Sequence, residues 1–340
     1  MTKVIKAGNV LIGGNNKISV QSMTNTDTAD AEATLSQIDR LYKAGCDIVR
    51  VTVPNENAAK ALYKITGLSP LPVVADIHFD YRLALLSIDA GVSKVRINPG
   101  NIGSMENVKK VAAAAKEKGV PIRIGVNSGS IEKELGAATP ENMVKSAKKH
   151  IKMLEDCSFY DIAVSLKASD VRTTVEAYRL ASKSFDYPLH VGVTEAGTAY
   201  GGLVRSSVGI GSLLLSGIGD TIRVSLTADP VEEVRAGIEI LRSLDLRKGP
   251  RLISCPTCGR TKIDLIKIAA EVDDRLSAID KDITVAVMGC AVNGPGEAKN
   301  ADIGIAGGDK EALLFKKGRI IRKLDEKTIV DELFKEIERL

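Results

Sequence analysis

The chain has 340 residues, of which 44% are apolar and 4% aromatic, and its formal net charge is +4. This length exceeds one typical hydrophobic core, so we expect one large domain and a smaller one. The slight positive charge fits an anionic small molecule as well as a weak nucleic-acid contact, so the charge alone does not decide between them. The scarcity of aromatic side chains and the absence of Trp argue against base stacking.

The sequence also bears on compartment. The amino terminus lacks the long apolar core of a signal peptide, and no apolar run reaches the length of a membrane span, so we expect no association with a membrane. The cysteines number five, and an odd number argues against a disulfide framework and for a reducing cytoplasm.

Short runs rich in β-branched residues recur along the first two thirds of the chain, with helical apolar spacing between them. The predicted strands are residues 18–23, 48–53, 73–77, 94–98, 122–126, 162–166, 189–194 and 221–226. Helical stretches such as 31–44 and 108–118 lie between them, and the expected helix stops are Gly45, Gly67, Gly91 and Gly119.

Eight strand–helix units in about 245 residues predict an α/β fold with an N-terminal (β/α)8 TIM barrel. An open doubly wound sheet is the alternative, but such a sheet more often has a glycine-rich phosphate turn after its first strand. Here the first strand leads instead into Gln21-Ser-Met-Thr-Asn25.

Four predicted strands carry an arginine between apolar residues, and a lysine ends a fifth. These cations are Arg50, Arg96, Arg123, Arg223 and Lys167. Side chains alternate between the lumen and the helix layer of a barrel, so these arginines point inward, where an unpaired guanidinium is costly to bury. The expected inward carboxylates, Asp76, Glu195 and Asp220, are fewer. We therefore expect a phosphate or diphosphate ligand at the carboxyl-terminal mouth. An internal salt-bridge network is the alternative, above all for Arg223, which follows Asp220.

Polar residues follow several strands at the same mouth, where this fold carries its catalytic groups. They stand in Asp76-Ile-His78, Asn98-Pro-Gly-Asn101, Asn127-Ser-Gly-Ser130 and Thr194-Glu195-Ala-Gly197. Glu195 is the candidate general acid because it is a single carboxylate among many cations. His150, in a lysine-rich helical stretch, is expected to be solvated.

The segment Leu246-Arg-Lys-Gly-Pro250 combines charge with a Gly-Pro break and predicts the domain boundary. The barrel then takes residues 1–247, and a small α+β domain takes residues 248–340. In the second domain we expect strands at 251–254, 283–288, 302–306 and 312–316, a helix near 261–270 and a terminal helix from 326.

Three cysteines of the second domain lie in two short motifs. Cys255-Pro-Thr-Cys258 forms a C-x-x-C pair, and Cys290 precedes Asn293-Gly-Pro-Gly-Glu297. A closed structural zinc site requires four Cys or His ligands, and this region has neither a fourth cysteine nor a histidine. An iron–sulfur cluster usually takes four thiolates but tolerates a substitute, and Glu297 is the nearest candidate. The residues favour a reactive cluster over structural zinc.

The chain resembles the 4-hydroxy-3-methylbut-2-enyl-diphosphate synthases, iron–sulfur enzymes of the non-mevalonate isoprenoid pathway, along nearly its whole length. The motifs that carry the resemblance are Val20-Gln-Ser-Met-Thr-Asn25, Ala75-Asp-Ile-His78, Arg96-Ile-Asn-Pro-Gly100, Arg123-Ile-Gly-Val-Asn127, Gly192-Val-Thr-Glu-Ala-Gly197, Ser254-Cys-Pro-Thr-Cys-Gly-Arg260 and Met288-Gly-Cys-Ala-Val-Asn-Gly-Pro-Gly-Glu297. They fit the compact bacterial type of the family, without the extra central domain of plant-type members.

The resemblance implies a ligand set and a substrate. A [4Fe-4S] cluster would be held by Cys255, Cys258, Cys290 and Glu297. The substrate would be 2-C-methyl-D-erythritol 2,4-cyclodiphosphate, a polyanion. The residues expected to bind it are Arg50, Asp76, His78, Arg96, Arg123, Asn127, Lys167, Thr194, Arg223, Ser225, Arg260 and Asn293.

The resemblance also implies a reaction and partners. The cyclodiphosphate would undergo two-electron reductive ring opening with loss of water, giving 4-hydroxy-3-methylbut-2-enyl diphosphate, with Glu195 and Glu297 as catalytic residues. Electrons would come from flavodoxin or ferredoxin through the cluster, in a cytoplasmic homodimer whose active site forms between subunits. The residue patterns alone leave two alternative functions. One is a barrel with a structural zinc ribbon that binds nucleic acid or a protein, and the other is a pterin-type barrel synthase. The second leaves the cysteines unexplained.

Overall fold

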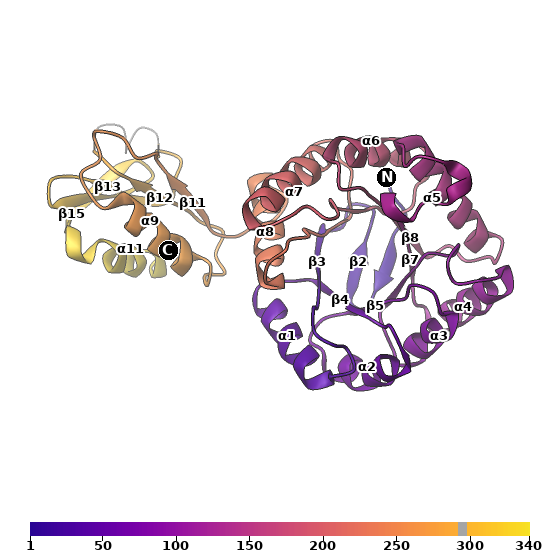
Figure 1. Ribbon diagram of the computed structural model, residues 1–340. Coiled ribbons are helices and arrows are strands. Elements are labelled where there is room, and N and C mark those ends of the chain that lie inside the picture. Colours follow the sequence, from indigo (N-terminus) through magenta and orange to yellow (C-terminus); the bar gives the residue numbers. More distant parts are fainter. Residues whose placement is uncertain (292–297) are drawn as a thin grey trace. The chain divides into compact units, whose positions relative to one another are not determined.

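The computed structural model describes residues 1–291 and 298–340 of the chain (Figure 1). The chain forms two compact units, Met1–Leu246 and Arg247–Leu340. Each has its own hydrophobic core, and each is described here by itself.

The first unit is a parallel eight-stranded barrel, as the spacing of strands and helices predicts. The strands follow one another in the order β8-β7-β6-β5-β4-β3-β10-β9, and a bridge between Val164 and Leu189 joins β8 to β9. The barrel strands are β3 (Ser19–Met23), β4 (Ile48–Thr52), β5 (Val73–Asp76), β6 (Lys94–Ile97), β7 (Ile122–Asn127), β8 (Ile162–Lys167), β9 (His190–Val191) and β10 (Thr221–Ile222).

Helices surround these strands, as Figure 1 shows. They are α1 (Ala31–Lys43), α2 (Glu56–Leu68), α3 (Tyr81–Asp89), α4 (Met105–Lys118), α5 (Pro140–Glu155), α6 (Val171–Ser182), α7 (Ala199–Leu214) and α8 (Pro230–Ser243). Polar caps begin most of them; Asp30 and Asp170, for example, accept hydrogen bonds from the first-turn amides of α1 and α6. Gly119 ends α4 in the left-handed conformation, with φ at 64°. Gly67, expected to end a helix, lies inside α2 because α2 continues to Leu68.

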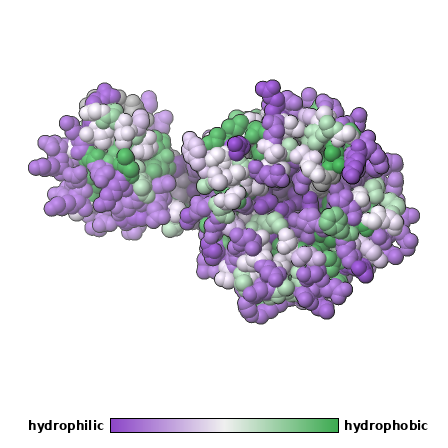
Figure 2. Space-filling view, viewed as in Figure 1, coloured by the Kyte–Doolittle hydropathy of each residue, from purple (hydrophilic) through white to green (hydrophobic). Residues whose placement is uncertain are grey.

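The alternation of side chains along the strands separates an apolar layer from a polar lumen. Val49 and Val51 of β4 are fully buried in the cluster that packs the strands against the helices. Arg50 between them therefore faces the lumen, since neighbouring side chains of a strand point to opposite faces. The same alternation sets Arg96 and Arg123 inward. In Figure 2, hydrophilic residues gather around the centre of the barrel face that is shown.

A short hairpin precedes the barrel and was not expected from the sequence. Strands β1 (Ile5–Ala7) and β2 (Val10–Ile12) pair antiparallel. Their buried side chains form one apolar cluster with residues near the starts of barrel strands, namely Ile48, Val74 and Ala163. The hairpin therefore covers the amino-terminal end of the barrel and leaves the opposite end as the mouth.

In its described residues, 247–291 and 298–340, the second unit is a five-stranded mixed sheet with two helices against it. The strand order is β11-β12-β13-β14-β15. The elements are β11 (Arg251–Ser254), β12 (Thr284–Met288), β13 (Ile303–Gly307), β14 (Glu311–Lys316), β15 (Arg319–Asp325), α9 (Leu265–Leu276) and α11 (Ile329–Glu338). Edge strand β15 was missed in the sequence because six of its seven residues are exposed, so it lacks the apolar alternation of a buried strand. In the described part of the chain, no helix is both long and apolar enough to span a membrane.

The hairpin contact predicts a stability difference between two neighbouring residues. Replacing Ile12, which is 2% exposed, by Ala should lower the free energy of unfolding by about 2–4 kcal/mol, because it leaves a cavity against the barrel strands. Leu11→Ala is the matched control, since Leu11 is 46% exposed, and should change it by less than about 0.5 kcal/mol. Urea unfolding measures both; equal losses would mean that the hairpin does not contribute to the barrel core.

Candidate active site

A cavity of about 220 Å³ opens at the carboxyl-terminal ends of the barrel strands. This volume corresponds to roughly seven water molecules, enough for a small anion. Its lining consists of Met23, Arg50, Asp76, His78, Arg96, Arg123, Asn127, Ser165, Lys167, Thr194, Arg223 and Ser225. The structure thus brings together ten of the twelve residues that the sequence predicts for substrate binding.

Two lining residues, Met23 and Ser165, were not predicted. Arg50 donates hydrogen bonds to the Sδ of Met23 from Nη2 at 2.8 Å and from Nε at 3.2 Å. Arg123 donates to Ser165 Oγ at 3.0 Å. Their positions in the sequence could have predicted them, because each lies two residues from another inward side chain of its strand. Their residue types could not, because a thioether and a hydroxyl are not typical partners of a guanidinium.

Charge in the cavity is strongly unbalanced. Five cationic side chains line it, and Asp76 is the carboxylate among the lining residues. The Asp76 carboxylate lies 3.0 Å from Arg96 Nη1 and 3.5 Å from Arg50 Nε. Burial alone would raise the pKa of Asp76, but Arg50 and Arg96 outweigh it and lower this pKa to about 2. Asp76 is therefore ionised at neutral pH and compensates one of the five cations.

Arg123 and Lys167 carry the least compensated charges. They are 2% and 6% exposed, and within the described residues neither has a carboxylate at ion-pair distance. Burial, with repulsion from Arg50 and Arg96, lowers the pKa of Arg123 well below its usual range. Burial, with repulsion from Arg223 and Arg123, does the same for Lys167. An anion placed between them would remove this electrostatic cost.

A further lumen cation, Lys94, lies on β6 two residues before Arg96 and is 1% exposed. Burial, together with Arg123 and Arg50, lowers the pKa of Lys94 to about 7. The crowding of positive charge therefore extends along the lumen below the cavity lining.

Two glycines at inward positions provide the room for these long side chains. A Cβ added to Gly125 would lie 2.6 Å from Arg96 Nε. One added to Gly192 would lie 2.3 Å from the backbone oxygen of Arg223 and 2.8 Å from Lys167 Nζ. Such contacts are shorter than van der Waals distances, so side chains at these two positions would displace the cations.

Glu195 stands on the rim, in the loop that follows β9, and its side chain is exposed. Its φ of 51° is in the left-handed region, which is unfavourable for a residue with a Cβ and is found often at functional sites. The loop is tied to the next one, because Gly197 O accepts a hydrogen bond from Thr227 N at 2.9 Å. His78, also exposed, lines the cavity from the loop after β5.

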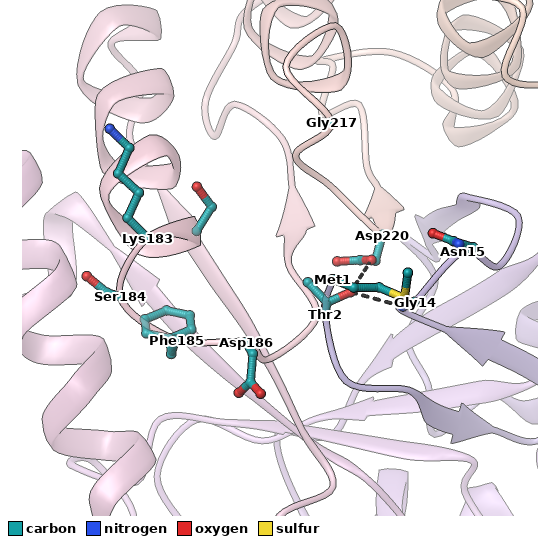
Figure 3. Close-up of a pocket in the computed structure, with 11 residues that line it drawn as sticks. Met1, Thr2, Gly14, Asn15, Lys183, Ser184, Phe185, Asp186, Gly217 and Asp220 are labelled. Carbon is teal, nitrogen blue, oxygen red and sulfur yellow. Dashed lines mark hydrogen bonds between the residues drawn. The ribbon is translucent and has the colours of Figure 1, made fainter.

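The interpretation of Asp220 as an inward carboxylate beside Arg223 is wrong. Asp220 accepts hydrogen bonds from Thr2 Oγ1 at 2.8 Å and from Leu189 N at 2.7 Å. Figure 3 shows it at a separate pocket of about 640 Å³ that the amino terminus helps to line. Asp220 thus fastens the amino terminus to the barrel, at the starts of the strands and away from the mouth.

The carboxylate near Arg223 is Glu233 of α8, which sequence reasoning missed. Its Oε2 lies 3.7 Å from Arg223 Nη2, and the residue is 5% exposed. Helical periodicity could have predicted it, because Glu233 falls on the same face of α8 as the buried Gly237 and Ile240. An acidic residue at a buried helix position indicates a partner inside the fold.

His150, expected to be solvated, is fully buried. It lies on the apolar face of α5 with Ala147 and Leu154, and its Nε2 is 3.1 Å from Glu132 Oε1. A Cβ on Gly100 would come within 2.8 Å of this nitrogen, so His150 packs directly under the loop after β6. Its place is structural, behind the mouth.

The three cysteines of the second unit lie on loops that follow two adjacent parallel strands, β11 and β12. Gly289 N donates to Cys255 Sγ at 3.1 Å, and Lys262 N donates to Gly289 O at 2.9 Å, which ties the loop after Cys258 to the loop before Cys290. The backbone N–H and side chain of Arg260 lower the pKa of Cys258. Arg260 therefore lies beside a thiol of the second unit and is not part of the cavity lining.

The donor chemistry of these loops suits an iron–sulfur cluster, because thiolates that receive N–H hydrogen bonds are its usual ligands. Among residues 1–291 and 298–340, no three Cys, His, Asp or Glu side chains are grouped so as to hold a metal ion. The predicted residues Asn293 and Glu297 lie outside the described residues.

Comparison with models of protein families identifies the family to which the chain belongs. Residues 2–238 match the GcpE TIM-barrel domain, and residues 251–339 match the GcpE protein C-terminal domain. The chain belongs to this family. The resemblance to 4-hydroxy-3-methylbut-2-enyl-diphosphate synthases and the prediction of an oxidoreductase are thereby confirmed.

Curated relatives of the family match the chain over its full length. A protein of Caldanaerobacter subterraneus subsp. tengcongensis is 61% identical, with 100% of this chain and 97% of the relative covered. A protein of Clostridium perfringens is 58% identical, with 100% and 99% covered. Both are named 4-hydroxy-3-methylbut-2-en-1-yl diphosphate synthase (flavodoxin).

Solved structures of other enzymes share the barrel. The Yersinia pestis dihydropteroate synthase superimposes with a TM-score of 0.53 at 12% identity and covers 72% of this chain and 98% of its own. The 3-dehydroquinate dehydratase of Geobacillus kaustophilus gives 0.52 at 14% identity and covers 72% and 99%. At these identities the likeness shows the barrel fold alone.

Arg96 pairs with the Asp76 carboxylate, whereas Arg123 has no carboxylate at ion-pair distance among the described residues, and this difference gives a prediction. Arg123→Ala should weaken binding of inorganic diphosphate roughly tenfold or more, because a charge-assisted contact is worth about 1.5–3 kcal/mol. The midpoint of thermal unfolding without ligand should stay constant or rise, since a buried, uncompensated charge is removed.

Arg96→Ala is the matched control. It should weaken binding and also lower the unfolding midpoint, because Asp76 loses its closest partner. Titration calorimetry and thermal unfolding measure the two quantities. If Arg123→Ala lowered the midpoint and left diphosphate binding intact, the arginines would form an internal network and no anion site.

Proposed function

We propose that the chain catalyses the two-electron reductive ring opening and dehydration of 2-C-methyl-D-erythritol 2,4-cyclodiphosphate to 4-hydroxy-3-methylbut-2-enyl diphosphate. The observation that carries this proposal is the cavity with five cationic side chains and one carboxylate in its lining. A cyclic diphosphate supplies the negative charge that this cavity lacks. The names of the curated relatives, each more than half identical to this chain, support the same reaction.

Binding rests on the buried cations. Arg123 and Lys167 are the proposed principal ligands of the diphosphate, because their own charges lack a carboxylate partner at ion-pair distance in the described part of the chain. Arg50 and Arg96 are held by Asp76 and present their remaining N–H groups to the cavity. Asn127, Thr194 and Ser225 supply neutral polar groups around it.

Proton delivery is assigned to Glu195. It stands at the rim in a left-handed backbone conformation, beside Thr194 of the cavity lining. A carboxylic acid there can donate the proton that the departing oxygen needs when water is lost. His78, on the rim after β5, and Asp76 complete the proposed polar surroundings of the sugar-derived carbons.

The cofactor is proposed to be a [4Fe-4S] cluster held by Cys255, Cys258, Cys290 and Glu297. When bound, such a cluster supplies electrons one at a time and acts as a Lewis acid. The protein's part is to provide N–H donors to the sulfur atoms, as Gly289 does to Cys255. Asn293 and Arg260 are proposed to contact the substrate from this unit.

The remaining partners follow from the same assignment. Flavodoxin, named for the relatives, is the proposed electron donor, with ferredoxin as the alternative. We propose a cytoplasmic homodimer in which the cysteine-bearing unit of one subunit completes the barrel site of the other.

The direct test of the reaction is an anaerobic assay of purified protein with the cyclodiphosphate and reduced flavodoxin. Formation of 4-hydroxy-3-methylbut-2-enyl diphosphate, detected by phosphorus NMR, is expected. A brown protein that consumes no cyclodiphosphate with either flavodoxin or ferredoxin would refute the proposed reaction.

The cluster assignment predicts a difference between two cysteines. Cys290→Ser should abolish the broad visible absorption of anaerobically purified protein and its bound iron, because one thiolate ligand is lost. Cys157→Ser is the matched control, since Cys157 lies in the barrel unit and bonds to Met153 O, and should keep both. A colourless wild type with one equivalent of zinc would support the structural-zinc alternative.

The dimer assignment predicts complementation. Cys258→Ser should be inactive alone, and Arg123→Ala should keep about a tenth of wild-type activity or less at cyclodiphosphate concentrations far below KM. When the two variants are mixed under these conditions and allowed to exchange at random, activity should rise to roughly a quarter of wild type, since half of the dimers then carry one intact site of two. Subunit exchange is verified separately with tagged chains. Exchange without any recovery of activity would mean that each chain completes its own site.

A further inference from the structure

Glu233 makes three contacts from one buried carboxylate at the start of α8. Its Oε1 accepts a hydrogen bond from Leu226 N at 2.9 Å, and its Oε2 accepts one from Ser22 Oγ at 3.2 Å. The same Oε2 lies 3.7 Å from Arg223 Nη2. Glu233 thus connects α8 with β3 and with the segment that leaves β10.

The contact with Leu226 fixes a loop that carries site residues. Leu226 N belongs to the backbone between Ser225, which lines the cavity, and Thr227. Thr227 N in turn donates to Gly197 O at 2.9 Å, and Gly197 lies two residues after Glu195. One side chain on α8 therefore restrains both the loop after β10 and, through it, the loop that bears the proposed acid.

The position of Glu233 separates this role from substrate binding. The side chain is 6% exposed and does not belong to the cavity lining, so a ligand in the cavity would touch Arg223 and Ser225 but not Glu233. Its charge still acts on the site, since it opposes the lowering of the pKa of both Arg50 and Lys167. Placement in the first turn of α8 is also favourable for a carboxylate.

We infer that Glu233 is a positioning residue of the active site. It holds Arg223 and the two rim loops in the arrangement that the reaction requires, while its negative charge competes with the bound diphosphate for Arg223. This inference rests on the proposed function for its effect on turnover, and on the geometry alone for its effect on anion binding.

Two substitutions separate the effect of the length of the Glu233 side chain from the effect of its charge. Glu233→Gln keeps the length of the side chain and an oxygen for Leu226 N, but it removes the charge. Glu233→Asp keeps the charge, but it is one methylene shorter and draws the carboxylate away from Leu226 N. Glu232→Gln is the matched control, because Glu232 neighbours Glu233 in the same turn and pairs with Arg235 at the surface, at 3.0 Å.

The steady-state kinetics of the reconstituted enzyme give the first test. Both Glu233 variants should lower kcat at least tenfold, because misplacement of site groups by a fraction of an ångström is costly to catalysis. The KM for the cyclodiphosphate should fall in Glu233→Gln and stay near wild type in Glu233→Asp, while Glu232→Gln changes neither. Wild-type kcat in a folded Glu233 variant would overturn the inference; if one variant fails to fold, the other carries the test.

Binding of inorganic diphosphate to the wild type and to Glu233→Gln gives a second test that needs no turnover. Loss of the competing charge should tighten binding about two- to fivefold, with no change in Glu232→Gln. Unchanged or weaker binding would overturn the inference. A wild type that binds diphosphate but does not convert the cyclodiphosphate would refute the proposed reaction while leaving this second test valid.

Discussion

The excess of buried positive charge at the barrel mouth is the constraint on which the rest of this structure depends. Five cations line a cavity of about 220 Å³, against one lining carboxylate, Asp76, and one behind the strands, Glu233. Buried charges of one sign repel each other strongly at low dielectric. The fold therefore bears a cost in stability at the mouth, and the proposed polyanionic ligand would relieve this cost.

Several features of the barrel serve this arrangement. Gly125 and Gly192 leave space where any Cβ would displace Arg96 or Lys167. The amino-terminal hairpin covers the opposite end of the lumen with apolar side chains, so the polar lumen opens at the mouth. The ties from Glu233 to Leu226 and from Thr227 to Gly197 hold the loops that surround the cations. The charges, the packing and the loop contacts thus all shape the carboxyl-terminal rim, where active sites of this fold usually lie.

The sequence could predict the barrel and most of the cavity because both depend on local alternation. An arginine between two buried valines, such as Arg50, can face only the lumen. The sequence could not predict Glu233 as the neighbour of Arg223, because their pairing depends on how α8 packs against β3 and β10. The misreading of Asp220 has the same origin: proximity along the chain suggested a pair, whereas Asp220 points to the amino terminus. Edge strand β15 and the buried His150 were missed because one is an exposed strand and the other a polar residue on an apolar helix face.

The location at which the proposed substrate binds is the most direct test of this account. A crystal structure of the protein prepared without oxygen and soaked with 2-C-methyl-D-erythritol 2,4-cyclodiphosphate would provide it. We expect phosphate oxygens within hydrogen-bond distance of Arg123 and Lys167, with Asp76 still paired to Arg96. A cyclodiphosphate bound elsewhere, with only water between Arg123 and Lys167 at saturating ligand, would contradict it.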